Sequence, residues 1–257
     1  MTIITLSLHN HSNASPDSRS DIQRMIRKCE EHGIDAIAIT DHDIVFDINR
    51  LKGIKTKVKI IPGIEISTED DAHIIGLFVS SYIKPRRDAL TIIRDIHKQK
   101  GLAILPHPFR KWQGYLSSKY NRSKTEINSV LNEIDCAEVY SGKCTPKENE
   151  AAKLFFKGRK IPLIGGSDAH TINEIGNVLL KIEITNENIR EGLLDANRKI
   201  VIDSTNKYLE QISYKIRRFG KKTVNFFGIK KSSRIYRTLR ELYLNLLVSI
   251  KKLLKRK

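Results

Sequence analysis

Residues 34–42 read IDAIAITDH, a run that is apolar apart from Asp35 until it ends on a threonine, an aspartate and a histidine. Continuous hydrophobic strands of this kind are typical of parallel sheets that helices cover on both faces. The preceding segment, Ser20 to His32, predicts an amphipathic helix, with Gly33 at its end and capping-box spacing between Ser20 and Gln23. The run is therefore expected to be the strand of a helix–strand unit, with polar residues at its C-terminal end.

The same alternation of strands and helices extends along the chain in both directions. Further helices are expected at Pro85–Lys100 and from Thr145, which has capping-box spacing with Glu148, to Gly158. Further strands are expected at 3–8, 58–66, 72–79, 102–106, 135–140, 161–166, 178–184 and 199–202. Repeated strand–helix units predict an α/β fold, which is either a barrel or a doubly wound sheet.

The composition of the 257-residue chain suits a soluble globular protein, with 40% apolar and 29% charged residues. It contains no run of 18 apolar residues that would predict a transmembrane helix. The opening residues, MTIITLSLHNH, lack the basic and apolar regions of a secretory signal. The three cysteines, Cys29, Cys136 and Cys144, form no CxxC pair, so we expect a reduced, cytoplasmic protein.

Most of the net charge of +17 comes from residues 205–257. That segment holds 16 of the 46 Lys and Arg residues and 2 of the 29 Asp and Glu residues, a net charge of +14. Residues 1–204 carry the remaining +3, so they are nearly neutral. We therefore expect one domain over residues 1–204 and a basic tail over residues 205–257.

Six of the eight histidines lie at the ends of expected strands. Each of the six follows, closes or begins a strand: His9, His11, His42, His73, His107 and His170. A single histidine at a strand end is more often a hydrogen-bonded structural residue than a metal ligand. The joint pattern is different, because the C-terminal ends of barrel strands form one rim at which functional residues gather.

Three carboxylates, Asp17, Glu65 and Asp168, stand among these histidines. Alternate residues of an extended segment share a face, so the side chains of an HxH or DxH pair are expected to point the same way. Imidazole and carboxylate without thiolate suit Zn, Mn or Fe. Nine donors exceed the needs of one ion, so we expect two or three ions, with Glu65 bridging. Such ions favour phosphoryl hydrolysis by a metal-bound hydroxide rather than by a serine or cysteine nucleophile.

Six motifs occur in an order that resembles the PHP family, named for polymerase and histidinol phosphatase domains. They are HNHSNASPDS (9–18), AITDHD (38–43), GIEIS (63–67), HIIG (73–76), PHP (106–108) and GGSDAH (165–170). The resemblance covers residues 3–183 and is greatest to stand-alone PHP phosphoesterases. It implies a distorted, seven-stranded (β/α)7 barrel with a trinuclear site. The basic tail carries no motif of the family and would add a helical extension to this barrel.

The resemblance also implies how the donors divide among three ions. The first set is His9, His11, Glu65 and Asp168. The second set is Glu65, His73 and His107. The third set is Asp17, His42 and His170. Of the two candidate catalytic residues, Asp41 is expected to orient a ligand and Arg110 to bind a substrate phosphate, although a solvent-exposed arginine without a role is the alternative.

Only 60 residues separate His107 from Asp168, which leaves space for a modest cap around residues 111–134. In the tail, apolar stripes at 208–219 and 235–253 predict two amphipathic helices with basic polar faces. Three hypotheses compete for the role of these helices. They would pack on the barrel or a partner, bind an anionic membrane surface, or contact nucleic acid. The sequence leaves the three alternatives open, so a peripheral membrane location stays among them.

The expected function is the hydrolysis of a phosphoester, and a phosphomonoester is favoured. A nuclease acting on single-stranded nucleic acid is the second hypothesis. The third is a catalytically inert PHP module that docks a partner or a membrane through its tail. The nearly complete set of metal donors counts against the third hypothesis, because an inert module would tolerate the loss of ligands.

Overall fold

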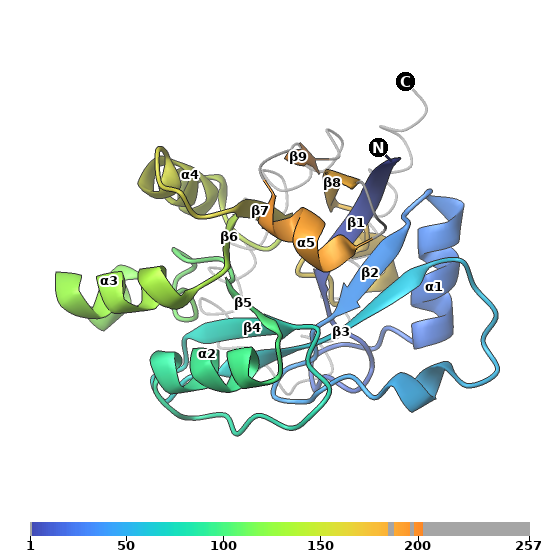
Figure 1. Ribbon diagram of the computed structural model, residues 1–257, viewed down its shortest axis with the longest axis horizontal. Coiled ribbons are helices and arrows are strands. Elements are labelled where there is room, and N and C mark those ends of the chain that lie inside the picture. The colour runs from blue at the N-terminus through green and yellow to red at the C-terminus, as the bar shows by residue number, and fades with distance from the viewer. Residues whose placement is uncertain (1, 185–187, 196–197, 203–257) are drawn as a thin grey trace, which may run out of the picture. The chain divides into compact units, whose positions relative to one another are not determined.

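The computed structural model describes residues 2–184, 188–195 and 198–202 (Figure 1). The chain divides into two units, Met1–Val201 and Ile202–Lys257, and of the described residues only Ile202 belongs to the second. The helices expected at 205–257 lie outside the described residues. Within the described part of the chain, no helix has the length and apolar character needed to cross a membrane.

The described strands form one mixed sheet. The strands are β1 (Thr2–Asn10), β2 (Ala36–Ile39), β3 (Lys59–Ser67), β4 (His73–Leu77), β5 (Leu102–Leu105), β6 (Cys136–Ser141), β7 (Leu163–Gly166), β8 (Val178–Ile184) and β9 (Arg198–Ile202). Their order is β7-β6-β5-β4-β3-β2-β1-β8-β9. Strands β1–β3 are mutually parallel, as are β5–β7, whereas β4 is antiparallel to both of its neighbours.

The sheet curves until the segment after β7 meets the end of β1. Ser167 N donates to Leu8 O at 3.0 Å, and His11 N donates to Ala169 O at 2.8 Å. Strand β8 pairs with β1 in the antiparallel sense beyond this junction. The expected barrel is therefore confirmed as a nearly closed, distorted barrel, and the doubly wound sheet is wrong.

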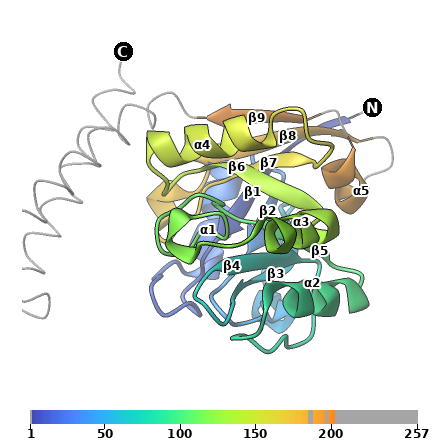
Figure 2. The same ribbon diagram turned by 90° about the vertical axis from the view of Figure 1, so that its left-hand side faces the viewer.

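The helices outside the curved sheet are α1 (Ile22–Glu31), α2 (Ala89–Lys98), α3 (Lys124–Glu133) and α4 (Pro146–Phe156) (Figures 1 and 2). Helix α5 (Ile189–Leu194) instead packs Ile189 and Leu193 into a buried cluster on the inner face of the sheet. Short 3-10 helices lie at Ile48–Leu51, Ser118–Tyr120 and Ile172–Glu174. The capping box expected at the start of α4 is present, with Thr145 and Glu148 as its two members.

Two helix starts differ from the expectation. Helix α1 is capped by Asp21 rather than by a Ser20–Gln23 box, because the Asp21 carboxylate accepts the free N–H groups of Gln23 and Arg24. Helix α2 begins only after Asp88, whose side chain accepts from Thr91 N. Arg86 has a φ of 61°, which is incompatible with a helix starting at Pro85.

The segment expected to be a cap is the connection between β5 and β6. Its second half forms helix α3, and Val130, Leu131 and Ile134 are buried in the same cluster as residues of α2 and α4. That half is therefore an outer layer of the barrel rather than a cap. Its first half, residues 111–120, contains the Ser118–Tyr120 turn.

Alternate residues of each strand face opposite sides of the sheet. On β2, Ile37 and Ile39 pack with α1, whereas Ala36 and Ala38 belong to another buried cluster on the inner face. We call that inner cluster the apolar layer. It consists of Leu6, Leu8, Ala36, Ala38, Ile61, Ile75, Leu77, Leu102, Ile104, Cys136, Ile164, Leu180, Ile182, Ile184, Ile189 and Leu193.

The inner face changes character toward the C-terminal ends of the parallel strands. On β3 the inner positions run from Ile61 to Glu65, and on β6 they run from Cys136 to Glu138. Because β4 is antiparallel, its first residue, His73, pairs with Ser67 at the last residue of β3. The reversed direction of β4 therefore brings a histidine at a strand start to the same rim as residues at strand ends.

Candidate metal centre

Three of the expected donors sit on left-handed backbone. The φ angles are 60° at His9, 30° at His107 and 48° at Asp168. The pairing register of β1 shifts between Ser7 and Asn10, so His9 lies in a bulge rather than on a regular extended strand. Simple alternation therefore does not explain how paired donors converge. Local bends at the strand ends turn these side chains toward the centre, at a cost that the surrounding hydrogen bonds must offset.

The carboxylate of Glu65 lies at the middle of the donors and is 1% exposed. Its Oε1 atom is 2.8 Å from His73 Nδ1 and 2.9 Å from His107 Nε2. Its Oε2 atom is 3.2 Å from His9 Nε2 and 3.3 Å from His11 Nε2. The two oxygens thus face two different sets of imidazoles, which is the arrangement of a carboxylate able to bridge two cations.

Asp168 completes the set formed by His9 and His11. Its Oδ1 atom is 3.6 Å from His9 Nε2 and 3.5 Å from His11 Nε2. All three side chains are buried. Together with the Glu65 contacts, this geometry brings together the four residues that the resemblance assigns to one ion.

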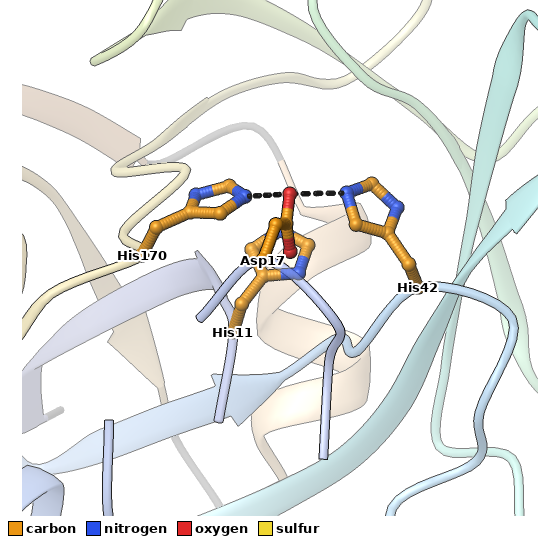
Figure 3. Close-up of side chains that lie close together, drawn as sticks. All are labelled: His11, Asp17, His42 and His170. Atoms are coloured by element: carbon orange, nitrogen blue, oxygen red, sulfur yellow. Dashed lines mark hydrogen bonds and ion pairs between the residues drawn. The ribbon is translucent and has the colours of Figure 1, made fainter. Parts of the chain in front are cut away.

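A third set of donors lies at the more exposed edge of the centre (Figure 3). Asp17 Oδ2 is 2.9 Å from His170 Nε2 and 3.5 Å from His42 Nε2, and the His11 ring stacks on the His170 ring at 4.2 Å. The Asp17 side chain is 50% exposed, in contrast to Glu65 and Asp168. His42 connects this third set to Glu65, because its Nδ1 atom is 3.3 Å from Glu65 Oε2.

The ionisable groups of the centre shift one another's pKa values. Burial opposes ionisation of Glu65, but His73, His9 and His42 outweigh it and hold the pKa of Glu65 well below its usual range. Burial disfavours protonation of His9, but the charges of Glu65, Asp168 and Glu138 raise its pKa well above the ordinary value. The pKa of Asp17 is likewise lowered against the effect of burial, by hydrogen bonds from His170 and His42.

The nine donor atoms fit divalent metal ions. Within the described residues they form groups of three or four in which the ligand atoms all lie within 4.8 Å of one another. His11 Nε2 is buried and makes no hydrogen bond, although carboxylate oxygens of Glu65 and Asp168 lie nearby. A buried nitrogen that faces two carboxylates without bonding to either is expected where a cation is held between them.

The two candidate catalytic residues lie in different environments. Asp41 is buried, and its two oxygens accept from Ser12 N at 2.6 Å and Ser12 Oγ at 2.7 Å, so it holds the loop after β1. Arg110 Nη1 donates to Asp168 Oδ2 at 2.6 Å, so this guanidinium points into the centre. Burial disfavours its charge, but Asp168 raises the pKa of Arg110, which keeps the guanidinium cationic.

Glu138 belongs to the centre, but the sequence reasoning did not single it out. Its Oε1 atom is 3.1 Å from His9 Nδ1, and its Oε2 accepts from His107 N at 2.8 Å. A Cβ at Gly166 would collide with Glu138 Oε1, so the glycine of the GGSDAH segment makes room for this carboxylate. The available signal was a lone glutamate on the buried strand 135–140.

Comparisons with known proteins fit this geometry. A family model described as PHP domain matches residues 7–211. An uncharacterized protein of Methanocaldococcus jannaschii is 29% identical over 182 residues, which cover 70% of this chain and 71% of that protein. The match to the family model thus includes all nine donors.

Solved structures share the fold. A two-domain protein of Bacteroides vulgatus that contains a predicted PHP-like metal-dependent phosphoesterase has a TM-score of 0.60 and 21% identity. The match covers 78% of this chain and 65% of that one. A lesion-specific endonuclease of Pyrococcus furiosus has a TM-score of 0.56 and 17% identity, with 77% of this chain and 58% of that one covered. This chain thus covers less than two thirds of the length of either protein.

Proposed function

The chain belongs to the PHP domain family, and on that premise we propose that it is a metal-dependent hydrolase that cleaves a phosphomonoester. The observation that carries the proposal is the position of Glu65. Its two carboxylate oxygens face separate sets of histidines at 2.8–3.3 Å, in a centre with few uses other than holding several cations.

The donor sets define which residues would hold the ions. His9, His11, Glu65 and Asp168 would hold one ion. Glu65, His73 and His107 would hold a second. Asp17, His42 and His170 would hold a third. Zinc, manganese and iron all suit these ligands. Bound there, adjacent divalent ions would supply an activated water at neutral pH and neutralise charge on the phosphoryl group.

The chain's own residues would position the substrate and the ligands. Arg110 would bind a phosphate oxygen, because only one of its nitrogens is engaged with Asp168 and its side chain is 27% exposed. Glu138 would fix the orientation of His9 by accepting from Nδ1, which leaves Nε2 to face the centre. Asp41 would act indirectly, by holding Ser12 and the loop that carries His11 and Asp17.

A nuclease is the second candidate function. The observation in its favour is the shared fold with the lesion-specific endonuclease of Pyrococcus furiosus. At 17% identity that likeness concerns the fold and not the substrate. A phosphomonoester remains the first choice because Arg110 offers a cationic group that suits the two negative charges of a terminal phosphate.

A panel of phosphoesters tests the proposal. The purified full-length protein, loaded in turn with Mn²⁺ and Zn²⁺, is offered p-nitrophenyl phosphate, bis(p-nitrophenyl) phosphate and a labelled single-stranded oligonucleotide. We expect turnover of the monoester and its loss in His9→Ala, whereas His97→Ala, on the outer helix α2, serves as the matched histidine control. Oligonucleotide shortening without monoester turnover would favour the nuclease. Absence of turnover with every metal and every ester would contradict both.

A further inference from the structure

The loop after β5 exposes an aromatic side chain flanked by two lysines. Trp112 is the only tryptophan of the chain, and 58% of its surface is exposed. The ammonium groups of Lys111 and Lys119 lie 5.0 Å and 5.4 Å from the centre of its indole ring. Lys119 also lies 4.7 Å from the ring centre of Tyr120, and the guanidinium carbon of Arg122 lies 4.2 Å from the centre of the same ring. Both ammonium groups lie over an aromatic ring, and within the described residues neither forms a salt bridge, so neither charge is bound by a carboxylate.

This loop is attached to the metal centre on both sides of Trp112. Two residues before it, the Arg110 guanidinium bonds to Asp168. One residue after it, the carbonyl oxygen of Gln113 accepts from His73 N at 3.1 Å. Because two residues span at most about 7 Å, the backbone of Trp112 lies beside the rim that carries the donors.

The loop is held by hydrogen bonds, and its backbone is strained at the tryptophan. Trp112 has a φ of 81°, an angle that is rare for a bulky side chain. Gly114 N donates to Arg110 O at 2.8 Å, and a Cβ at Gly114 would lie 2.6 Å from His107 O. Tyr120 donates its hydroxyl to the carbonyl oxygen of Trp112 at 2.5 Å. Strain of this kind persists where the surroundings enforce it, and it is concentrated at functional sites.

We propose that Trp112, Lys111 and Lys119 form a platform that stacks a nucleobase on the indole ring and neutralises its phosphates, so that the substrate is a phosphoester carrying a nucleobase. An exposed aromatic ring offers every base a stacking surface, and adjacent cations bind the backbone phosphates. An isolated exposed tryptophan would need no explanation, but this one is held in a strained turn between two contacts to the metal centre. The inference deepens the proposed function, because it rests on a phosphoester being cleaved at that centre.

The single tryptophan makes the platform directly observable. The full-length, metal-loaded protein is titrated with a phosphorothioate-linked oligo-dT that resists cleavage, and its intrinsic fluorescence is followed. The matched ligand is an oligomer of the same length and charge with abasic residues. We expect oligo-dT to quench Trp112 and to bind more tightly than the abasic oligomer. Thymidine 5′-phosphate and ribose 5-phosphate repeat the comparison for a mononucleotide source.

Substitutions then separate stacking from charge. Because Trp112→Ala removes the reporter, binding is measured by anisotropy of a labelled oligo-dT, and we expect it to weaken about 5- to 150-fold. Trp112→Phe should restore much of the affinity, since phenylalanine also stacks. Tyr82→Ala, which removes an aromatic side chain that is 70% exposed on another loop, is the matched control and should leave binding unchanged.

Equal affinity for oligo-dT and the abasic oligomer, unchanged fluorescence, or quenching by ribose 5-phosphate as strong as by thymidine 5′-phosphate would overturn the platform. Hydrolysis of p-nitrophenyl phosphate by the wild type is measured separately. Base-dependent quenching without that turnover would leave the platform standing and count against the proposed hydrolase. Turnover without base-dependent quenching would overturn the platform and leave the proposed hydrolase standing.

Discussion

The inner face of the barrel has two regions of opposite chemistry, built from the same strands. The apolar layer fills one end, and the polar rim, consisting of the nine donors and Glu138, occupies the other. On β3 the change takes place between Ile61 and Glu65, both of which are at most 2% exposed. Burial of the apolar layer stabilises the fold, whereas burial of charged groups at the rim costs stability unless opposite charges offset it. On the proposed function, stability and activity would thus depend on different ends of one surface.

The largest expected effect comes from removing the carboxylate that the rim surrounds. Glu65→Ala deprives five histidines of their shared partner and would remove the proposed bridge between two ions. We expect phosphoester turnover to fall about 10³-fold, which corresponds to about 4 kcal/mol of transition-state stabilisation. Metal content per chain, measured by plasma mass spectrometry after gel filtration, should fall with it. Retention of full metal content would contradict the bridging role.

The matched substitution in the apolar layer should lower stability and leave metal binding unchanged. Ile61→Ala lies on the same strand and the same face, four residues before Glu65. We expect it to lower the free energy of unfolding by about 2–5 kcal/mol, because the methyl groups leave a cavity. Chemical denaturation measures that loss, and metal content should stay at the wild-type value. A loss of ions in this variant would mean that the two regions are not independent.

Glu138 tests whether metal binding at the rim depends on a residue outside the nine expected donors. Glu138→Gln leaves one acceptor oxygen for two donors, His9 Nδ1 and His107 N. We expect metal affinity to fall about 10- to 100-fold, as when the partner of a ligating histidine is removed. Competition with a chelating dye measures the affinity. Gly166→Ala should produce a similar loss by displacing the same carboxylate, and a normal affinity in both variants would exclude this role.

Asp17 should matter less, because it belongs to the exposed edge of the rim. Asp17→Asn keeps one acceptor oxygen, and water can replace the other at a side chain that is 50% exposed. We expect the outermost ion to bind about tenfold more weakly, at the lower end of the range for altered ligand environments. Calorimetric titration should then show one weakened site and unchanged tight sites. Equal weakening of all sites would contradict the division into inner and outer sets.

The smallest effect concerns the protein without ions. The pKa of His9 is raised above its unfolded value because, despite burial, Glu65, Asp168 and Glu138 favour its charged form. Its stabilising contribution is therefore complete below the unfolded pKa, about 6.5, and is lost as pH rises through the folded pKa. Denaturation in EDTA should show the free energy of unfolding decreasing above that pH. In His9→Gln the decrease should be smaller, and an identical curve would contradict the assignment.

The sequence predicted the composition of the rim better than its geometry. The nine donors were recognisable because each follows, closes or begins an apolar strand, and the barrel makes those positions neighbours. The left-handed backbone at His9, His107 and Asp168 was not recognisable, because contacts with distant strands impose it. Glu138 was missed because its partners, His9 and the amide of His107, are far away in sequence. Asp21 replaced Ser20 as a helix cap because local sequence offered two suitable residues.

Anomalous diffraction from crystals of the full-length protein grown with Mn²⁺ tests the central claim most directly. The account predicts two or three strong peaks around Glu65, with at least one peak close to each of its carboxylate oxygens and none in the apolar layer. A map without peaks among the nine donors, or with manganese bound only at surface carboxylates, would contradict it.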